Sequence, residues 1–139
     1  MALWRLYYHV IWATRERQAM ILPHLQDPLY SYILKKAASL ECIPHAIGGI
    51  EDHLHLLVSI PPKHSIADFV RHVKGSSAHY LNHTIQADGF AWQHGYGVFS
   101  LGGRQLPTAI RYVQQQKEHH RQGTTIPALE QDQEDTGDE

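Results

Sequence analysis

The most informative segment of the chain is a short apolar run, His53-Leu54-His55-Leu56-Leu57-Val58-Ser59-Ile60, which two prolines follow. Its length and aliphatic content are typical of a β-strand, and the prolines would end it. Because successive side chains of a strand point to opposite faces, both histidines are expected on one face and the alternate aliphatic residues on the other. The run therefore predicts a sheet that carries two neighbouring imidazoles on one side.

Six further elements are expected around this strand. Strands are predicted at residues 4–13, 43–50 and 96–101, and helices at residues 27–41, 65–82 and 106–120. An early proline, Pro44, suits an edge position for the strand at 43–50. The order of elements is typical of an α+β fold of the ferredoxin-like (RRM-like) kind. In that fold a four-stranded antiparallel sheet carries helices on one face, and here one more C-terminal helix follows.

Length and composition limit the class of protein. A chain of 139 residues with 42% hydrophobic and 19% charged residues fits one globular domain. No apolar run approaches the ~18 residues of a membrane span, and the N-terminus lacks the pattern of a secretory signal, so a soluble, cytoplasmic protein is expected. A single cysteine, Cys42, excludes an internal disulfide and a four-cysteine zinc module.

The charge is unevenly distributed along the chain. The net charge is −2, yet six of the 14 acidic residues lie in the last ten positions, so the rest of the chain is mildly basic. A basic body is compatible with a polyanionic partner. We therefore expect a domain at residues 1–123 and an acidic, disordered tail at residues 124–139. A sharper alternative is that this tail competes within the molecule for a basic groove.

The two histidines suggest a metal site. With 12 histidines in the chain, a His-x-His triplet is expected about once by chance, so surface histidines are the simple alternative. On a strand, however, His53 and His55 lie about 7 Å apart at the backbone, which suits a shared divalent cation. In the helix at 106–120, Tyr112 and Gln116 lie one turn apart on one polar face and could add a third ligand.

An open metal site beside a tyrosine suits nucleophilic attack on phosphorus. A phenol, with a pKa near ~10, is a poor nucleophile at neutral pH unless the phosphate is made more electrophilic. A cation on a phosphate oxygen would do this and would stabilise the leaving oxygen. The product would be a phosphotyrosine ester, which keeps the energy of the broken phosphodiester for rejoining strands.

Four blocks of the sequence resemble a known family. They are residues 48–58 (Gly-Gly-Ile-Glu-Asp-His-Leu-His-Leu-Leu-Val), 70–77, 92–100 and 109–120. In this order they are similar to the HUH (histidine, hydrophobic, histidine) single-tyrosine transposases, which mobilise bacterial insertion sequences as single-stranded DNA. The resemblance extends over nearly the whole body of the chain.

The resemblance implies a mechanism and a set of residues. His53, His55 and Gln116 would bind Mg²⁺ or Mn²⁺, and Tyr112 would be the nucleophile. The enzyme would be a homodimer with joined sheets that cuts single-stranded DNA near hairpins at the element ends and holds the 5′-phosphate on Tyr112. A free 3′-hydroxyl would then attack this ester. Gly102-Gly103 would be the hinge that lets the tyrosine helix serve its own subunit or the partner's.

Basic and aromatic residues could supply the DNA contacts. The predicted contacts are Arg71, Lys74, Arg111 and Trp92. Arg71 and Lys74 are favoured because they belong to a matched block.

Two other functions stay open at this stage. One is a host-adopted relative that nicks repeated hairpins without mobilising its own gene. The other is a non-catalytic module that binds single strands on the sheet and needs neither histidines nor metal. A histidine phosphohydrolase fits less well, because Leu57 stands where a His-x-His-x-His run would continue.

Overall fold

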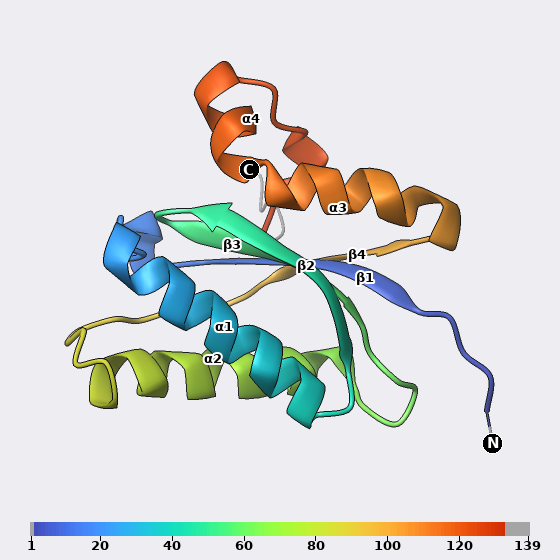
Figure 1. The fold of residues 1–139 in the computed structure, drawn as a ribbon, viewed down its shortest axis with the longest axis horizontal. Coiled ribbons are helices and arrows are strands. Elements are labelled where there is room, and N and C mark those ends of the chain that lie inside the picture. The colour runs from blue at the N-terminus through green and yellow to red at the C-terminus, as the bar shows by residue number, and fades with distance from the viewer. Residues whose placement is uncertain (1, 133–139) are drawn as a thin grey trace, which may run out of the picture.

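The computed structural model describes residues 2–132. Figure 1 shows a twisted sheet between two pairs of helices. The strands are β1 (Tyr7–Ala13), β2 (Ile43–Ile50), β3 (His53–Ser59) and β4 (Gly97–Leu101). The helices are α1 (Pro23–Ser39), α2 (Ile66–His83), α3 (Leu106–Gln114) and α4 (Gln116–Gln122), with short 3₁₀ turns at Arg15–Arg17, Gly103–Gln105 and Pro127–Leu129.

The sheet has the order β2-β3-β1-β4, and all its neighbouring strands are antiparallel. The predicted α+β fold is therefore confirmed, with β2 at an edge as its proline suggested. In the register of β1 and β3, Ile11 lies opposite His55 and Ala13 opposite His53. Because directly opposite residues share a face, this register fixes which side chains of β1 lie beside the two histidines.

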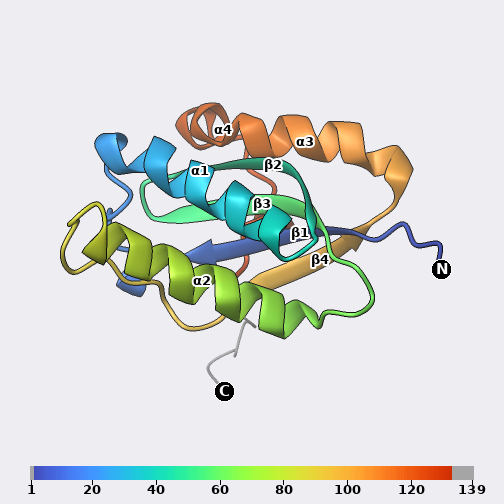
Figure 2. The same ribbon diagram turned by 60° about the horizontal axis from the view of Figure 1, so that its bottom comes forward.

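The main core lies between the sheet and the pair α1 and α2, which lie side by side in Figure 2. The alternate aliphatic residues of β3 (Leu54, Leu56 and Val58) point into this core. The other face of the sheet is covered by α3 and α4, where Leu57 packs against Ala46 and Val113. Each face of β3 is thus buried, and the histidines belong to the side of α3 and α4.

Two helices differ from their predicted bounds. The first begins at Pro23 instead of Asp27, because a proline fits the first turn of a helix and apolar residues from Leu25 onward are buried. Pro28 consequently lies inside the helix. The predicted helix at 106–120 is divided at Gln115, whose φ of −106° and ψ of 26° are not helical. Gly48 lets this helix lie close to β2, since a Cβ there would overlap the carbonyl of Val113.

The chain continues past α4 into a segment, residues 124–132, that runs back along the sheet. It contains the turn Pro127–Leu129, and the carbonyl of Gln131 lies so close to Gly97 of β4 that a side chain at Gly97 would overlap it. Disorder was predicted from residue 124, but the structure places residues 124–132 against the domain; residues 133–139 lie outside the described part. None of the described helices is long and apolar enough to span a membrane.

Candidate active site

The candidate site lies on the face of the sheet that α3 and α4 cover. His53 and His55 of β3 are almost fully buried there, and both rings point to the same side, as the strand pattern predicted. Tyr112 of α3 packs its ring against His55, with centroids 5.9 Å apart. The predicted nucleophile and the predicted histidine pair are therefore neighbours within one chain.

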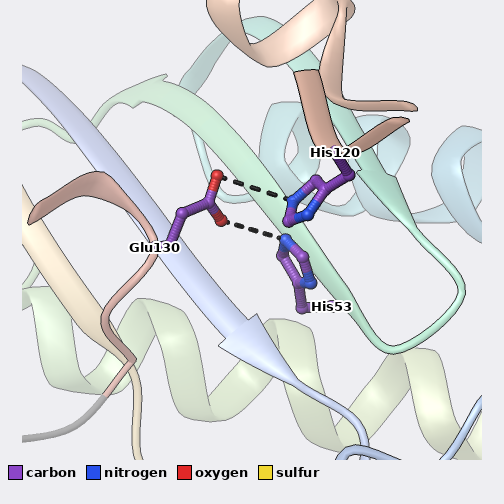
Figure 3. A group of neighbouring side chains, drawn as sticks. All are labelled: His53, His120 and Glu130. Carbon is purple, nitrogen blue, oxygen red and sulfur yellow. Dashed lines mark ion pairs between the residues drawn. The ribbon is translucent and has the colours of Figure 1, made fainter. Parts of the chain in front are cut away.

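A single carboxylate, that of Glu130, joins these groups. Its Oε2 lies 2.9 Å from His55 Nε2 and 3.1 Å from His53 Nε2. Its Oε1 accepts a hydrogen bond of 2.5 Å from the Tyr112 hydroxyl and lies 3.6 Å from His120 Nε2. Figure 3 shows Glu130 pointing from the C-terminal segment towards His53 and His120. The carboxylate thus lies between the phenol and the imidazoles.

The Tyr112 hydroxyl is fully engaged in this arrangement. Besides donating to Glu130, it accepts a hydrogen bond of 3.0 Å from the backbone N–H of Ile126. Burial, and then the hydrogen bond to Glu130, raise the pKa of Tyr112 to about 12. The phenol is therefore protonated near neutral pH and is not poised to react while Glu130 holds it.

Each site histidine has a different partner on its other nitrogen. His53 Nδ1 lies 2.7 Å from the carboxylate of Asp52, and His55 Nδ1 lies 2.7 Å from Nε2 of His9 on β1. Burial acts to lower the pKa of His53, but Asp52 and Glu130 outweigh it and raise this pKa to about 9. Burial lowers the pKa of His55, and burial together with the neighbouring His55 lowers the pKa of His9 to about 4. His9 and His55 are therefore an uncharged pair near neutral pH.

Glu130 carries the negative charge of the site. Burial opposes its ionisation, but the neighbouring His53 and His55 hold the pKa of this carboxyl well below its usual range. Its two oxygens occupy the positions where an anion would contact both the phenol and the imidazoles.

The residues present fit a divalent cation. His53 Nε2 is buried and has no aligned hydrogen-bond partner among residues 2–132, although it lies close to Glu130. His53, His120 and Glu130 each offer a ligand atom, and these atoms lie within 4.8 Å of one another. Imidazole nitrogens with a carboxylate or amide oxygen make a donor set that divalent metals accept.

The chain matches a described protein family over most of its length. The model of the family "Transposase IS200 like" matches residues 2–116. The chain belongs to this family. This membership makes it a DNA-processing enzyme of the transposase class, as the four sequence blocks suggested.

Individual relatives support this assignment. This IS200-like protein is 36% identical to the ISDra2 transposase TnpA of Deinococcus radiodurans over 77 residues, which are 54% of each chain. The match therefore spans about half the length of that relative. This IS200-like protein is also 25% identical to the IS200 transposase of Salmonella typhimurium, over 88% of this chain and 84% of that relative.

Two solved structures share the fold. A Deinococcus radiodurans R1 protein assigned as a transposase has a TM-score of 0.66 and 26% identity, covering 81% of this chain and 91% of its own. A REP-associated tyrosine transposase bound to a REP hairpin has a TM-score of 0.63 and 14% identity, covering 90% of this chain and 76% of its own. The second likeness concerns the fold alone.

Gln116, the predicted third ligand, lies behind the site in this IS200-like protein. It is buried, its Oε1 is 3.1 Å from His120 Nε2, and its amide donates to the Tyr112 carbonyl. His120, one turn further on, has its Nε2 3.6 Å from Glu130 Oε1. The predicted polar face of this helix is therefore packed against the sheet, because Tyr112 and Gln116 are as buried as Val113.

The predicted DNA contacts fall into two places. Arg71, Lys74 and Trp92 line a cavity of about 520 Å³ between α2 and residues 90–96. Lys74 Nζ donates to the carbonyls of Gln93 and Gly95, and the Trp92 ring is only half-buried, with its indole N–H on Ser77. Arg111 is exposed on α3, where it donates to Thr108. The structure thus groups three of the four residues and separates Arg111 from them.

The predicted hinge, Gly102-Gly103, connects β4 to the turn before α3. The backbone of Gly102 is extended, and its N–H donates to the side chain of Gln105. A Cβ on either glycine would meet nothing closer than ordinary contact distance. The hinge stays a prediction.

Sequence reasoning missed three residues of the site: His9, His120 as a direct neighbour of the carboxylate, and Glu130. His9 shares the strand alternation of Tyr7 and Ile11, which could have placed it on the histidine face. Glu130 directly follows Leu129 and lies four residues after Ile126, and these two apolar residues are a small sign that this part of the acidic tail packs against the domain.

Proposed function

We propose that this protein is a metal-dependent single-stranded DNA endonuclease and strand transferase in which Tyr112 is the nucleophile. One observation carries the proposal: a single carboxylate spans the gap between the Tyr112 hydroxyl, at 2.5 Å, and the His55 Nε2, at 2.9 Å. A phosphodiester also presents two oxygens with one negative charge. The groups that bind the two carboxylate oxygens could therefore bind two oxygens of a phosphodiester at the same place.

The metal ligands of the proposal are His53 and His55, with Gln116 as the third, and the ion is Mg²⁺ or Mn²⁺. The buried Nε2 of His53, which has no aligned hydrogen-bond partner among residues 2–132, supports this assignment. When bound, the cation supplies positive charge to a phosphate oxygen and to the departing 3′-oxygen. His120 and Glu130 complete the group while the C-terminal segment covers the site.

The reaction has two steps, and in each step one bond to phosphorus forms while another breaks. In the first, the Tyr112 oxygen attacks phosphorus and loses its proton, the bond from phosphorus to the 3′-oxygen breaks, and the 3′-end leaves as a hydroxyl. The 5′-phosphate is then esterified to Tyr112. In the second, a 3′-hydroxyl of another strand attacks this ester, the bond to Tyr112 breaks, and the phenol regains a proton. The number of phosphodiester bonds is conserved, so no ATP is required.

Attack requires Glu130 to leave. Its carboxylate binds the attacking hydroxyl and occupies the place of the phosphate, so both anions cannot be present together. The segment 124–132 is therefore a removable cover in this proposal. It would compete within the molecule for the active site, whereas the alternative from the sequence was competition for a basic groove.

The substrate of the proposal is single-stranded DNA with hairpins at the ends of an insertion sequence. Membership of the IS200-like family supports it, and one fold neighbour is described as bound to a REP hairpin. Arg71 and Lys74 beside the cavity on α2 are the proposed phosphate contacts, with Trp92 stacking on a base and Arg111 contacting DNA near Tyr112.

A homodimer is part of the proposal. Both edge strands, β2 and β4, offer backbone groups through which two sheets could join. In this structure the tyrosine helix lies over its own sheet, and the link at Gly102-Gly103 would allow it to serve the partner instead.

A labelled hairpin strand tests the proposal. Wild-type protein with Mn²⁺ should give a DNA-shifted protein band, EDTA should abolish it, and Tyr112→Phe should bind the strand without forming the band. Equal binding in EDTA with no cleavage under Mg²⁺ or Mn²⁺ would favour the non-catalytic binding module instead.

A further inference from the structure

His9 is a buried histidine that the mechanism above does not use. It lies on β1 with 2% of its surface exposed, and its Nε2 is 2.7 Å from Nδ1 of His55. The two ring centroids are 5.0 Å apart. In the register of β1 and β3, His9 lies opposite Leu57, two residues along β3 from His55, so both histidines are on the same face. His9 is therefore the group that contacts the inner nitrogen of His55.

The equivalent group behind His53 is of a different kind. Asp52 is a carboxylate, which only accepts hydrogen bonds when ionised, so Nδ1 of His53 keeps its proton whatever lies on the side of the site. An imidazole such as His9 can either donate or accept. The two site histidines thus have one fixed and one reversible partner.

The hydrogen-bond partners define two states of the His9–His55 pair. In the structure, His55 Nε2 faces the Glu130 carboxylate, which accepts; the proton of an uncharged His55 is then on Nε2, and Nδ1 accepts from His9 Nε2–H. To bind a cation through Nε2, His55 must carry its proton on Nδ1 and donate it to His9 Nε2. Both states keep one N–H···N bond between the rings.

We propose that His9 is a positioning residue that lets His55 exchange the Glu130 carboxylate for a metal ion by reversing the hydrogen bond between the two rings. This inference rests on the proposed function, because it assumes that His55 is a metal ligand. Proton balance is kept: the proton between the rings passes from His9 to His55, the Nε2 proton of His55 leaves to solvent, and His9 takes one on Nδ1. A cavity of about 430 Å³ that His9 lines gives water room beside the ring.

Three variants separate this role from a structural one. His9→Leu removes the hydrogen bond, His9→Gln keeps a side chain that can donate or accept, and His45→Leu is the control. His45 is another histidine of the sheet, and its Nε2 bonds to the hydroxyl of Ser59 outside the site. Binding of Mn²⁺ alone is measured by titration calorimetry on the full-length, metal-free proteins, with thermal unfolding as a check of folding.

His9→Leu should weaken Mn²⁺ binding by about 10- to 100-fold, the usual cost of losing an outer partner of a metal histidine. His9→Gln should recover most of the affinity, and His45→Leu should bind like wild type. Equal Mn²⁺ affinity of folded His9→Leu and wild type would overturn the inference. So would a His9→Gln variant that is folded but as weak as His9→Leu.

A spectroscopic measurement separates the inference from the proposed function. In ¹⁵N-labelled, metal-free wild-type protein, a scalar coupling should connect His9 Nε2 and His55 Nδ1 across their hydrogen bond, and Mg²⁺ should move the His55 proton from Nε2 to Nδ1. Absence of the coupling overturns the role of His9 even if Mn²⁺ binds. Failure of wild type to bind Mn²⁺, with the coupling present, overturns the metal site of the proposed function and the exchange that depends on it.

Discussion

Both faces of the central sheet are buried, but β3 presents apolar side chains on one face and histidines on the other. Towards α1 and α2, β3 presents Leu54, Leu56 and Val58 to a core made of apolar side chains. Towards α3 and α4, the same strand presents His53 and His55, whose ring nitrogens meet Asp52, His9 and Glu130. Burial of the first face is favourable in itself, whereas burial of the second is tolerated only where partners compensate lost hydration.

The elements that cover the two faces of the sheet also differ. The apolar face is covered by two long helices of 17 and 18 residues. The site face is covered by two short helices of nine and seven residues and by the segment 124–132, which reaches the site through Glu130. We infer that one face supplies stability and the other can open.

The largest effect is expected from His55→Ala on the site face. Loss of one proposed ligand should reduce Mn²⁺-dependent cleavage of a hairpin strand by at least about 100-fold, the scale of losing a group that stabilises charge in the transition state. DNA binding without metal should be nearly unchanged. A gel assay of cleavage and binding checks this, and cleavage at the wild-type rate would remove His55 from the site.

Leu56→Ala on the apolar face should act on stability instead. Leu56 is completely buried, so its truncation should lower the free energy of unfolding by about 2–5 kcal/mol. Urea unfolding measures this loss, and the cleavage rate of the remaining folded protein should stay close to wild type. A variant that is as stable as wild type but inactive would break the division between the faces.

The sequence predicted how the side chains of β3 alternate between the two faces, but it did not predict every group that contacts the buried histidines. The apolar run at 53–60 was sufficient to assign β3, its two faces and the histidine pair. Helical spacing put Tyr112 and Gln116 on one face of their helix, but only the resemblance to the transposase family placed Tyr112 beside the histidines. His9 was missed because a single histidine within an aromatic strand has no local sign of a long-range partner. Glu130 was missed because its composition is that of a solvated tail, whereas contacts with residues far along the chain hold it in place.

Glu130→Gln should show whether the segment 124–132 is a removable cover of the site. The neutral amide loses the attraction between the carboxylate and the imidazoles, so the segment should open more easily and a hairpin strand should form the covalent adduct several-fold faster at limiting DNA. Asp132→Asn is the matched control, because Asp132 lies in the same segment and pairs with Arg17 instead. Slower adduct formation by Glu130→Gln would instead make Glu130 a required ligand.

The smallest effect is expected from replacing one positively charged side chain that lies outside both faces of β3. Arg71→Ala should weaken DNA binding a few-fold and reduce the salt dependence of binding by about one phosphate contact. Arg71 is exposed and pairs only with Asp68 among the described residues, so stability should not change. Fluorescence anisotropy at several salt concentrations measures this, and an unchanged salt slope would remove Arg71 from the DNA contacts.

The central claim is tested most directly by locating the covalent bond. Wild-type protein is incubated with a hairpin-bearing single strand and Mn²⁺, digested with protease and nuclease, and analysed by mass spectrometry. The account predicts that the 5′-phosphate remains attached to the peptide that contains Tyr112. Attachment to another residue, or cleavage without any attached peptide, would contradict it.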